Sequence, residues 1–273
     1  MVRGRGFTLV ELVAVMTIIG AIAAVAASFI PGAVTSYQAV SRRAELTAVA
    51  ELALQRMARD LRAALPNSVR VTGGGTVLEL VESVDAARYR DDPPPGSPDA
   101  VLDFTAPDDA FDVIGRLTRF AEIQVPGDAV VIYNLGVAGA DAYAGDNRAA
   151  LAGGTTDSHI ALAAPTQFPR PSPRQRFFVV RGPVTYLCDP AAGTLTRYHG
   201  YGWHASQADV DTTAELAALG AGEARMAAGV TACSFTYQAG TSRRAALATL
   251  RISLAQGDES VTLLRQVHVV NAP

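Results

Sequence analysis

The chain has 273 residues, 49% of them hydrophobic, and a formal net charge of −3, which is enough for a membrane helix together with one or two globular parts. All 23 basic residues are arginine, which excludes Schiff-base lysines, a Walker-type phosphate-binding lysine and Ser–Lys dyads. The mild acidity argues against a general nucleic-acid-binding surface, although a local basic patch is compatible with it.

The N-terminal segment is built for lipid. A short basic leader, residues 1–6, precedes a mainly apolar run from Phe7 to Ile30, and Pro31 and Gly32 follow it. As a helix the run spans roughly 36 Å at about 1.5 Å per residue, enough to cross a hydrocarbon core of about 30 Å with some tilt. Glu11 lies inside this run, where a carboxylate opposes insertion by up to about 3 kcal/mol at mid-membrane depth. An acid in such a position indicates a function.

This segment resembles the class III signal of type IV pilins and pseudopilins, on the residues Gly6-Phe7-Thr8-Leu9-Val10-Glu11-Leu12. The resemblance implies that a prepilin peptidase cuts after Gly6 and that Phe7 becomes the N-methylated mature N-terminus. It also implies that Glu11 meets the α-amino group of Phe7 on a neighbouring subunit during filament assembly.

The resemblance further implies a single-pass protein of the bacterial inner membrane, with a cytoplasmic N-terminus and a periplasmic body that can enter a filament. The arginines alone leave the orientation open, because Arg3 and Arg5 favour a cytoplasmic N-terminus while Arg42 and Arg43 act in the opposite sense. An ordinary secretory signal cut near Ala24-Val25-Ala26 is the alternative. Such signals have shorter apolar regions of about 7–15 residues and gain nothing from an internal acid.

A helical pattern continues from Ala33 to Leu65, with apolar residues at steps of three and four. We therefore predict one long helix from Phe7 to about Leu65, with a hinge at Pro31-Gly32. The predicted parts are a leader at 1–6, a transmembrane or filament-core helix at 7–30, an amphipathic helix at 31–65 and a β-rich periplasmic body at 66–273.

The body is expected to be an antiparallel sheet that packs on the helix, which makes the fold α+β. Strands are predicted at 68–72, 76–82, 100–105, 119–125, 129–133, 159–163, 176–181, 184–188, 194–198, 230–237, 246–255 and 260–270. Helical segments are expected at 108–115 and 212–220, and loops at 84–98, 136–157 and 165–173.

A closer resemblance covers Phe178-Val179-Val180, Pro183 to Cys188, Val230 to Tyr237 and Leu264 to Pro273. These segments look like the MshO family, minor pilin-like proteins of the mannose-sensitive haemagglutinin (MSHA) pilus system. The J-type pseudopilins of type II secretion and the PilW-type minor pilins share that architecture. The resemblance implies a structural subunit that acts in filament initiation or at the tip, with other pilins and the inner-membrane assembly platform as partners.

Cys188 and Cys233 are the two cysteines, and both lie far from the membrane segment. In an exported body they are expected to form one disulfide, with two buried free thiols as the alternative. They form no CxxC pair, so redox catalysis is not expected.

The aromatic stretch around residue 200 is the candidate partner surface, because exposed aromatic side chains favour interfaces. Its candidate residues are Tyr198, His199, Tyr201, Trp203 and His204. The two histidines lack the cysteine pair or HExxH helix that zinc sites usually add, so no metal is predicted there.

The sequence contains no recognisable catalytic motif, and the prediction is a protein that is not an enzyme and holds no cofactor. Calcium at the loop aspartates is a weaker alternative, since the EF-hand spacing is absent. Two other functions stay open. One is a tip adhesin or DNA-capture pilin that uses the aromatic stretch, Arg243-Arg244 or the segment Arg170 to Arg176. The other, least favoured, is a membrane-anchored periplasmic enzyme.

Overall fold

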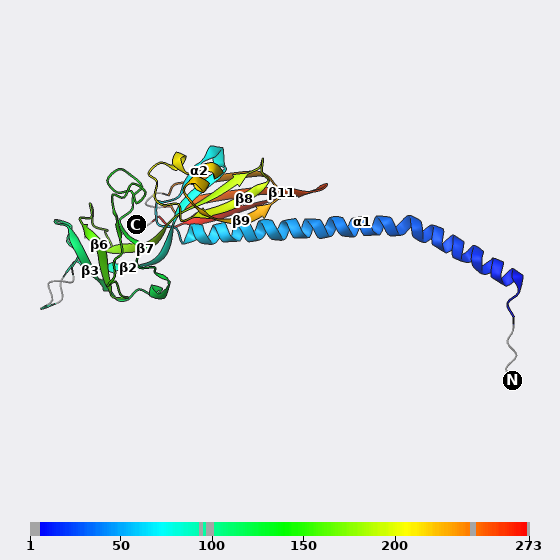
Figure 1. Ribbon diagram of the computed structural model, residues 1–273, viewed down its shortest axis with the longest axis horizontal. Helices are drawn as coiled ribbons and strands as arrows, with labels where there is room; N and C mark the ends of the chain where they lie inside the picture. The colour runs from blue at the N-terminus through cyan, green and yellow to red at the C-terminus, as the bar shows by residue number, and fades with distance from the viewer. Residues whose placement is uncertain (1–5, 93–94, 97–100, 241–243, 272–273) are drawn as a thin grey trace, which may run out of the picture.

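The computed structural model describes residues 6–92, 95–96, 101–240 and 244–271. Its first element is the helix α1 (Leu9–Arg62), half of which projects from the body (Figure 1). The Thr8 hydroxyl caps it by accepting a hydrogen bond from the Glu11 N–H at 3.3 Å. Arg59 and Arg62 lie in the last turn, where cations complement the helix dipole. The observed helix agrees with the predicted one to within a few residues at each end.

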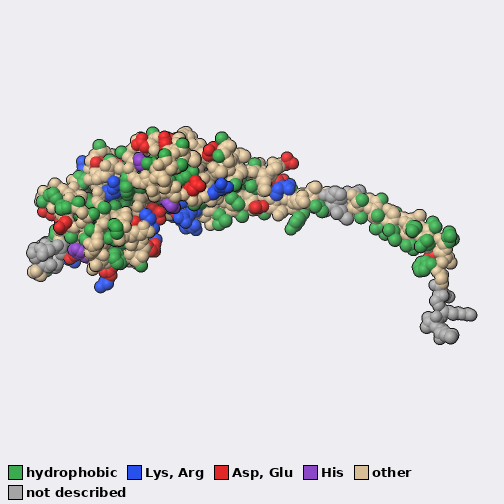
Figure 2. Space-filling model, in the orientation of Figure 1, with side chains coloured by type: hydrophobic (Ala, Val, Ile, Leu, Met, Phe, Trp, Pro, Cys, Tyr) green, Lys and Arg blue, Asp and Glu red, His purple; other side chains and the backbone are tan. Residues whose placement is uncertain are grey.

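The free half of α1 is the apolar half. Residues Leu9–Ala27 have a mean hydropathy of 2.5, and none of this segment is buried against the body. Hydrophobic side chains crowd this end, whereas arginine, aspartate and glutamate are spread over the body (Figure 2). By length and composition the segment can cross a membrane.

α1 passes through Pro31 and Gly32 without a break in its helical assignment. Proline has no N–H to donate to the carbonyl of Ala27, one turn earlier, so the expected weak point has a physical basis. The helix runs straight along the body and curves away toward its N-terminus (Figure 1). The predicted hinge is therefore a bend within one helix and not an interruption of it.

The second half of α1 buries one face against the body, as the spacing of its apolar residues predicts. The buried residues of this face are Leu46, Ala50, Ala53, Leu54, Met57, Ala58 and Leu61. The alanines let the sheets approach closely, and each large side chain stabilises the fold by about 1.5–3 kcal/mol relative to exposure.

The larger sheet is antiparallel and has β2 and β7 at its centre, paired from Val77 opposite Leu187 to Arg88 opposite Arg176. Its strands are β1 (Arg70–Thr72), β2 (Val77–Tyr89), β3 (Asp108–Ile114), β4 (Ala129–Ile132), β5 (Arg148–Ala150), β6 (His159–Thr166), β7 (Arg176–Asp189), β8 (Thr194–His199) and β9 (Gly222–Ala228). One half of β2 and β7 lies over α1, and the other half continues into the end of the body farthest from the N-terminus (Figure 1).

That far end is a closed barrel with the strand order β5-β4-β7-β2-β3-β6. The two outer strands meet through a bridge between Leu151 and Leu162, and the Ala152 N–H donates to the Ala161 carbonyl at 2.8 Å. Aromatic rings fill the interior, with Phe111 and Phe177 edge to face at 5.3 Å. This contact covers the outer edges of β5 and β6, which an open sheet would expose.

The smaller sheet contains β10 (Val230–Gln238), β11 (Ala246–Gln256) and β12 (Glu259–Val269), all antiparallel. It shares one hydrophobic core with α1 and the adjacent half of the larger sheet. Two ion pairs join it to the helix: Arg43 to Glu259 at 2.8 Å and Arg265 to Glu51 at 2.7 Å. The overall architecture is α+β, as predicted.

Short helical turns complete the body. They are η1 (Gly73–Gly75), η3 (Phe120–Glu122), η4 (Gln207–Asp209) and the helix α2 (Thr213–Ala218). α2 confirms the helix predicted at 212–220, and a capping box between Thr212 and Glu215 explains where it begins.

Several predicted segments are wrong. Residues 108–115 form β3 and not a helix, because Phe111 and Val113 face the barrel interior while aspartates alternate with them. Residues 119–125 contain η3 in place of a strand, the described residues 101–105 are irregular, and β9 and β5 were not predicted.

β7 also runs unbroken through Gly182-Pro183, where two separate strands were expected. β4 begins opposite Val180 and β8 ends opposite Val184, so residues 181–183 have no partner strand on that side. A proline is tolerated where such a partner is missing. This interruption leaves a notch in the sheet.

Candidate functional site

The residues of the predicted processing site lie just outside the helix. Gly6 and Phe7 are exposed and non-helical, and α1 begins at Leu9. Glu11 lies exposed in the first helical turn, where a carboxylate complements the positive end of the helix dipole. The acid is thus about one turn from Phe7. Cleavage after Gly6, methylation of Phe7 and the assembly role of Glu11 stay predictions.

Cys188 and Cys233 form the predicted disulfide, with Cα atoms 6.3 Å apart. Cys188 lies near the end of β7 and Cys233 in β10, so the bond joins the two sheets next to their shared core. The alternative of two buried free thiols is wrong.

Replacing both cysteines with alanine is expected to lower the free energy of unfolding by about 4 kcal/mol, because the bond closes a long loop in the unfolded chain. The sequence separation is 45 residues. Denaturant unfolding followed by the fluorescence of Trp203, the one tryptophan in the sequence, measures the loss. Reduction of the wild-type protein should give the same shift, and an unchanged midpoint in both cases would contradict the prediction.

The aromatic stretch around residue 200 is only partly on the surface. Tyr198 and Tyr201 are each 4% exposed, so the expectation of surface rings is wrong for these two residues. His199 is exposed, and Trp203 and His204 are half-buried. Whether a partner binds here stays untested, but the tyrosine rings are core residues.

Tyr201 is held by a buried carboxylate that sequence reasoning missed. Its hydroxyl donates to Glu79 at 2.9 Å and lies 2.7 Å from the Thr185 hydroxyl. Glu79 is fully buried in β2, and Arg70 Nε donates to its second oxygen at 2.7 Å. Burial raises the pKa of the Glu79 carboxyl above its ordinary value, while Arg70 and Tyr201 act to lower it.

The Arg70 side chain also binds main-chain carbonyls of the loop that follows β8. Its two terminal nitrogens donate to the carbonyls of His204 at 2.8 Å and Ala205 at 2.7 Å. Its guanidinium stacks on the Tyr143 ring at 3.6 Å. Through these contacts Arg70 and Glu79 join β1, β2 and the loop after β8, so we assign the pair a structural role.

A second arginine stacks on the tryptophan of this loop. The Arg148 guanidinium lies 3.8 Å from the Trp203 ring, which meets Tyr143 edge on at 6.3 Å. Burial lowers the pKa of Arg148 to about 10. One face of Trp203 is thus occupied by Arg148, and the indole also lines a cleft.

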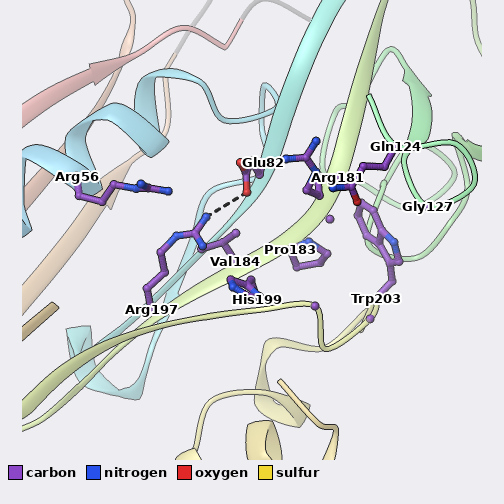
Figure 3. A pocket seen from close by; sticks show the side chains of 13 residues that line it. Arg56, Glu82, Gln124, Gly127, Arg181, Pro183, Val184, Arg197, His199 and Trp203 are labelled. Atoms are coloured by element: carbon purple, nitrogen blue, oxygen red, sulfur yellow. Dashed lines mark hydrogen bonds and ion pairs between the residues drawn. The ribbon is translucent and has the colours of Figure 1, made fainter. Parts of the chain in front are cut away.

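This cleft, of about 590 Å³, lies where α1, the notch in β7 and the aromatic loop meet (Figure 3). Its lining residues are Arg56, Glu82, Gln124, Gly127, Arg181, Gly182, Pro183, Val184, Arg197, His199, Gly200, Gly202 and Trp203. Of the sequence-predicted partner residues, only His199 and Trp203 line it.

The floor of the cleft is an ion-pair network centred on Arg197, which is 7% exposed. Arg197 donates to Asp60 of α1 at 3.0 Å and to Glu82 of β2 at 3.1 Å. The Tyr186 hydroxyl donates to the same Asp60 oxygen at 2.6 Å, and burial raises the pKa of Tyr186. This network ties the helix to the sheet.

Three of the loop aspartates considered for calcium, Asp108, Asp141 and Asp146, accept hydrogen bonds from nearby backbone N–H groups. The others are Asp91, Asp92 and Asp109. Asp141 accepts from the Tyr143 N–H at 3.0 Å, and Asp146 from the Gly139 N–H at 2.7 Å. Within the described part of the chain no group of three or more His, Cys, Asp or Glu residues is placed to hold a metal ion. Arg243, half of one candidate DNA contact, lies outside the described residues.

Residues 1–27 match the family model of the prokaryotic N-terminal methylation motif. The chain therefore carries a prepilin-type signal, which implies processing by a prepilin peptidase and assembly with other pilins. With the apolar start of α1, the signal fits a membrane-anchored, single-pass protein. Comparison with curated proteins and with solved structures gave no match.

Proposed function

We propose that this chain, which carries a prepilin-type signal, is a minor pilin-like structural subunit of a type IV pilus or a related secretion filament. The prepilin-type signal is the observation that carries the proposal. Cleavage after Gly6 gives a mature chain that begins at Phe7. The apolar half of α1 first anchors the subunit in the inner membrane, with the body in the periplasm, and then packs among its neighbours.

The shape of the molecule supports this proposal. The apolar half of α1 makes no contact with the body that would bury it, so it is available to lipid and then to other helices. The other half is fixed in the core by its buried face and by ion pairs to β12. A subunit of this form can leave the membrane without unfolding its body.

We further propose a role in filament initiation or at the tip, in a system of the MSHA type. The support is the resemblance of the segments near Cys188 and Cys233 to the MshO family, and the closed barrel that extends the body away from the helix. The contact between β5 and β6 covers the outer edges of these two strands, which then cannot continue a sheet.

Glu11→Ala is expected to leave cleavage intact but to reduce incorporation into filaments by roughly tenfold or more, because a charge-assisted contact to a neighbouring N-terminus is lost in a poorly hydrated place. Quantitative blotting of sheared filaments against total protein measures it. Glu45→Ala, an exposed acid of the same helix, is the matched control and should incorporate normally. Equal incorporation of both variants would argue against the role of Glu11.

A second candidate function is a tip binding module. The observation that favours it is the arginine-lined cleft between α1 and the barrel. Of the other candidate contacts, Arg176 lines a smaller hollow of about 330 Å³, and Arg243 lies outside the described residues. A salt-dependent affinity of the protein for DNA would favour the DNA-capture form of this function.

A further inference from the structure

We infer that the cleft beside the β7 notch binds an extended acidic peptide segment of a partner protein. This inference goes beyond the proposed filament role, and the cleft itself supports it. Its premises are a stretch of strand without a partner on one side, an arginine whose Nε has no hydrogen bond, and an apolar wall opposite that arginine.

The first premise is the notch. Gly182 and Pro183 of β7 pair with β2, and Arg181 lies at an irregularity of that pairing. On the other side residues 181–183 have no strand, because β4 begins opposite Val180 and β8 ends opposite Val184. The backbone at Arg181 and Gly182 therefore faces the cleft. An extended segment can occupy such a gap and use main-chain hydrogen bonds, as in strand addition to a sheet edge.

The rim of the notch leaves room for a second backbone. Gly200 and Gly202 have φ values of 73° and 83°, a left-handed conformation that favours glycine, so the loop after β8 bends twice without side chains. Gly127 and Gly182 line the cleft as well. Within 4 Å of a Cβ added at Gly182, Gly200 or Gly202 there is no atom, so the space is open.

The second premise is Arg56 of α1. Its Nε is buried and has no hydrogen-bond partner in the described part of the chain. It lies 3.1 Å from Asp60 Oδ1, outside hydrogen-bonding geometry, and the other Asp60 oxygen already accepts from Tyr186 and Arg197. The planar fork of a guanidinium matches a carboxylate in two parallel hydrogen bonds, so Arg56 is suited to an incoming acid.

The charge balance of the cleft also favours an acidic ligand. Among the described residues three arginines line it with one lining carboxylate, Glu82, which is paired with Arg197. Asp60, which is not part of the lining, pairs with Arg56 and Arg197. Arg181 Nε lies 3.4 Å from Oδ1 of Asp128, and Asp128 is buried. His199 adds a further polar side chain at the open rim.

The third premise is the apolar wall. Figure 3 places Arg56 and Trp203 on opposite sides of the cleft, with Pro183 and Val184 between them. A peptide segment whose acidic side chain binds Arg56 can therefore pack an adjacent apolar side chain against Pro183 and the indole of Trp203. A ligand that fits the cleft would therefore need an acidic group, apolar groups on either side of it and a main chain that can form hydrogen bonds. A peptide has all three, whereas a small free acid has only the first.

The test uses the full chain in detergent and the fluorescence of Trp203. The probes are a pentapeptide with blocked ends and a central glutamate between two leucines, its glutamine counterpart, and free glutarate. We expect saturable binding of the glutamate peptide, at least roughly tenfold tighter than that of the glutamine peptide, because a charge-assisted hydrogen bond is lost. Arg56→Gln should remove this preference, while Arg59→Gln, an exposed arginine one turn away, should keep it.

Each other outcome overturns the inference. Equal affinity for the two peptides would show that the acid is not recognised. Glutarate that binds as tightly as the glutamate peptide would identify a site for small acids. A flat fluorescence signal with both peptides would show that the notch is not a binding site. The peptide comparison needs no variant, so it stands even where Arg56→Gln impairs folding, and none of these results bears on cleavage or filament assembly.

Discussion

Gly6→Leu is expected to leave the chain at its precursor size, with no mature product. The matched motif covers residues 1–27, and the proposed cut follows Gly6. No atom lies within 4 Å of a Cβ added at Gly6, so the substitution does not disturb the fold of the chain itself. Its effect falls on the peptidase, which must approach the backbone at that peptide bond. Gel mobility and intact mass in cells that contain the prepilin peptidase measure the outcome.

Gly20→Leu is the matched control, because a Cβ at Gly20 also meets no atom within 4 Å and the position lies inside the apolar run. This variant should be processed normally. A Gly6→Leu chain that still begins at Phe7 would show that the proposed cut is misplaced. A wild-type chain that begins at Ala27 or Ser28 would instead indicate an ordinary secretory signal.

Arg70→Ala is expected to lower the free energy of unfolding by about 3–5 kcal/mol, because it leaves the fully buried Glu79 without its ion-pair partner. The substitution also frees the carbonyls of His204 and Ala205 and the face of Tyr143. Denaturant unfolding of the full chain in detergent, read by Trp203 fluorescence, measures the loss.

The loss should depend on pH. Burial already raises the pKa of Glu79, and removal of Arg70 eliminates the contacts that lower it most, so the folded pKa rises further. A carboxyl with a higher pKa in the folded state holds more protons there, and stability falls as the pH rises from the unfolded value through the folded one. The penalty of Arg70→Ala should therefore be smaller at pH 5 than at pH 8.

Two controls make this prediction specific. Arg116→Ala breaks an ion pair to Asp157 in which the arginine side chain is 76% exposed, and it should cost less than about 1 kcal/mol. Adding Glu79→Gln to Arg70→Ala removes the stranded charge, so the double variant should recover part of the loss and lose the pH dependence. A small, pH-independent effect of Arg70→Ala would show that Glu79 is not held by this pair.

The elements that sequence analysis predicted well are those whose pattern is local. The α1 boundaries, the hairpin of β11 and β12 and the small helix α2 follow from apolar spacing and capping residues. β3 was mistaken for a helix because three aspartates mask its alternation, and the end of β2 was mistaken for a loop because Asp85 and Arg88 are polar. The partner strands place these residues: Asp112 lies between the buried Phe111 and Val113, whereas Asp85 is itself buried and accepts a hydrogen bond from the Arg119 N–H.

The candidate site was predictable only in part for the same reason. The cysteine pair and the prepilin-type signal are visible as residue types at fixed places. Glu79, Arg70 and Tyr201 are assembled by strand register, and the hydrogen bond from Tyr201 to Glu79 spans 122 positions in the sequence. The cleft arises from where β4 begins and β8 ends, which no single segment encodes. An acid inside the apolar run of β2 was the one available signal.

The continuous pairing of β2 with β7 has a mechanical consequence. Part of the load of a pull between the membrane helix and the far end of the body passes along these two strands, since both run from the half over α1 into the barrel. Another part passes through direct contacts such as the hydrogen bond from Asn134 to the Pro66 carbonyl at 2.8 Å. Antiparallel hydrogen bonds lie perpendicular to the strands, so such a load strains them together in shear and not one after another. The body should therefore resist tension as one unit, and under increasing force it should unfold in a single step.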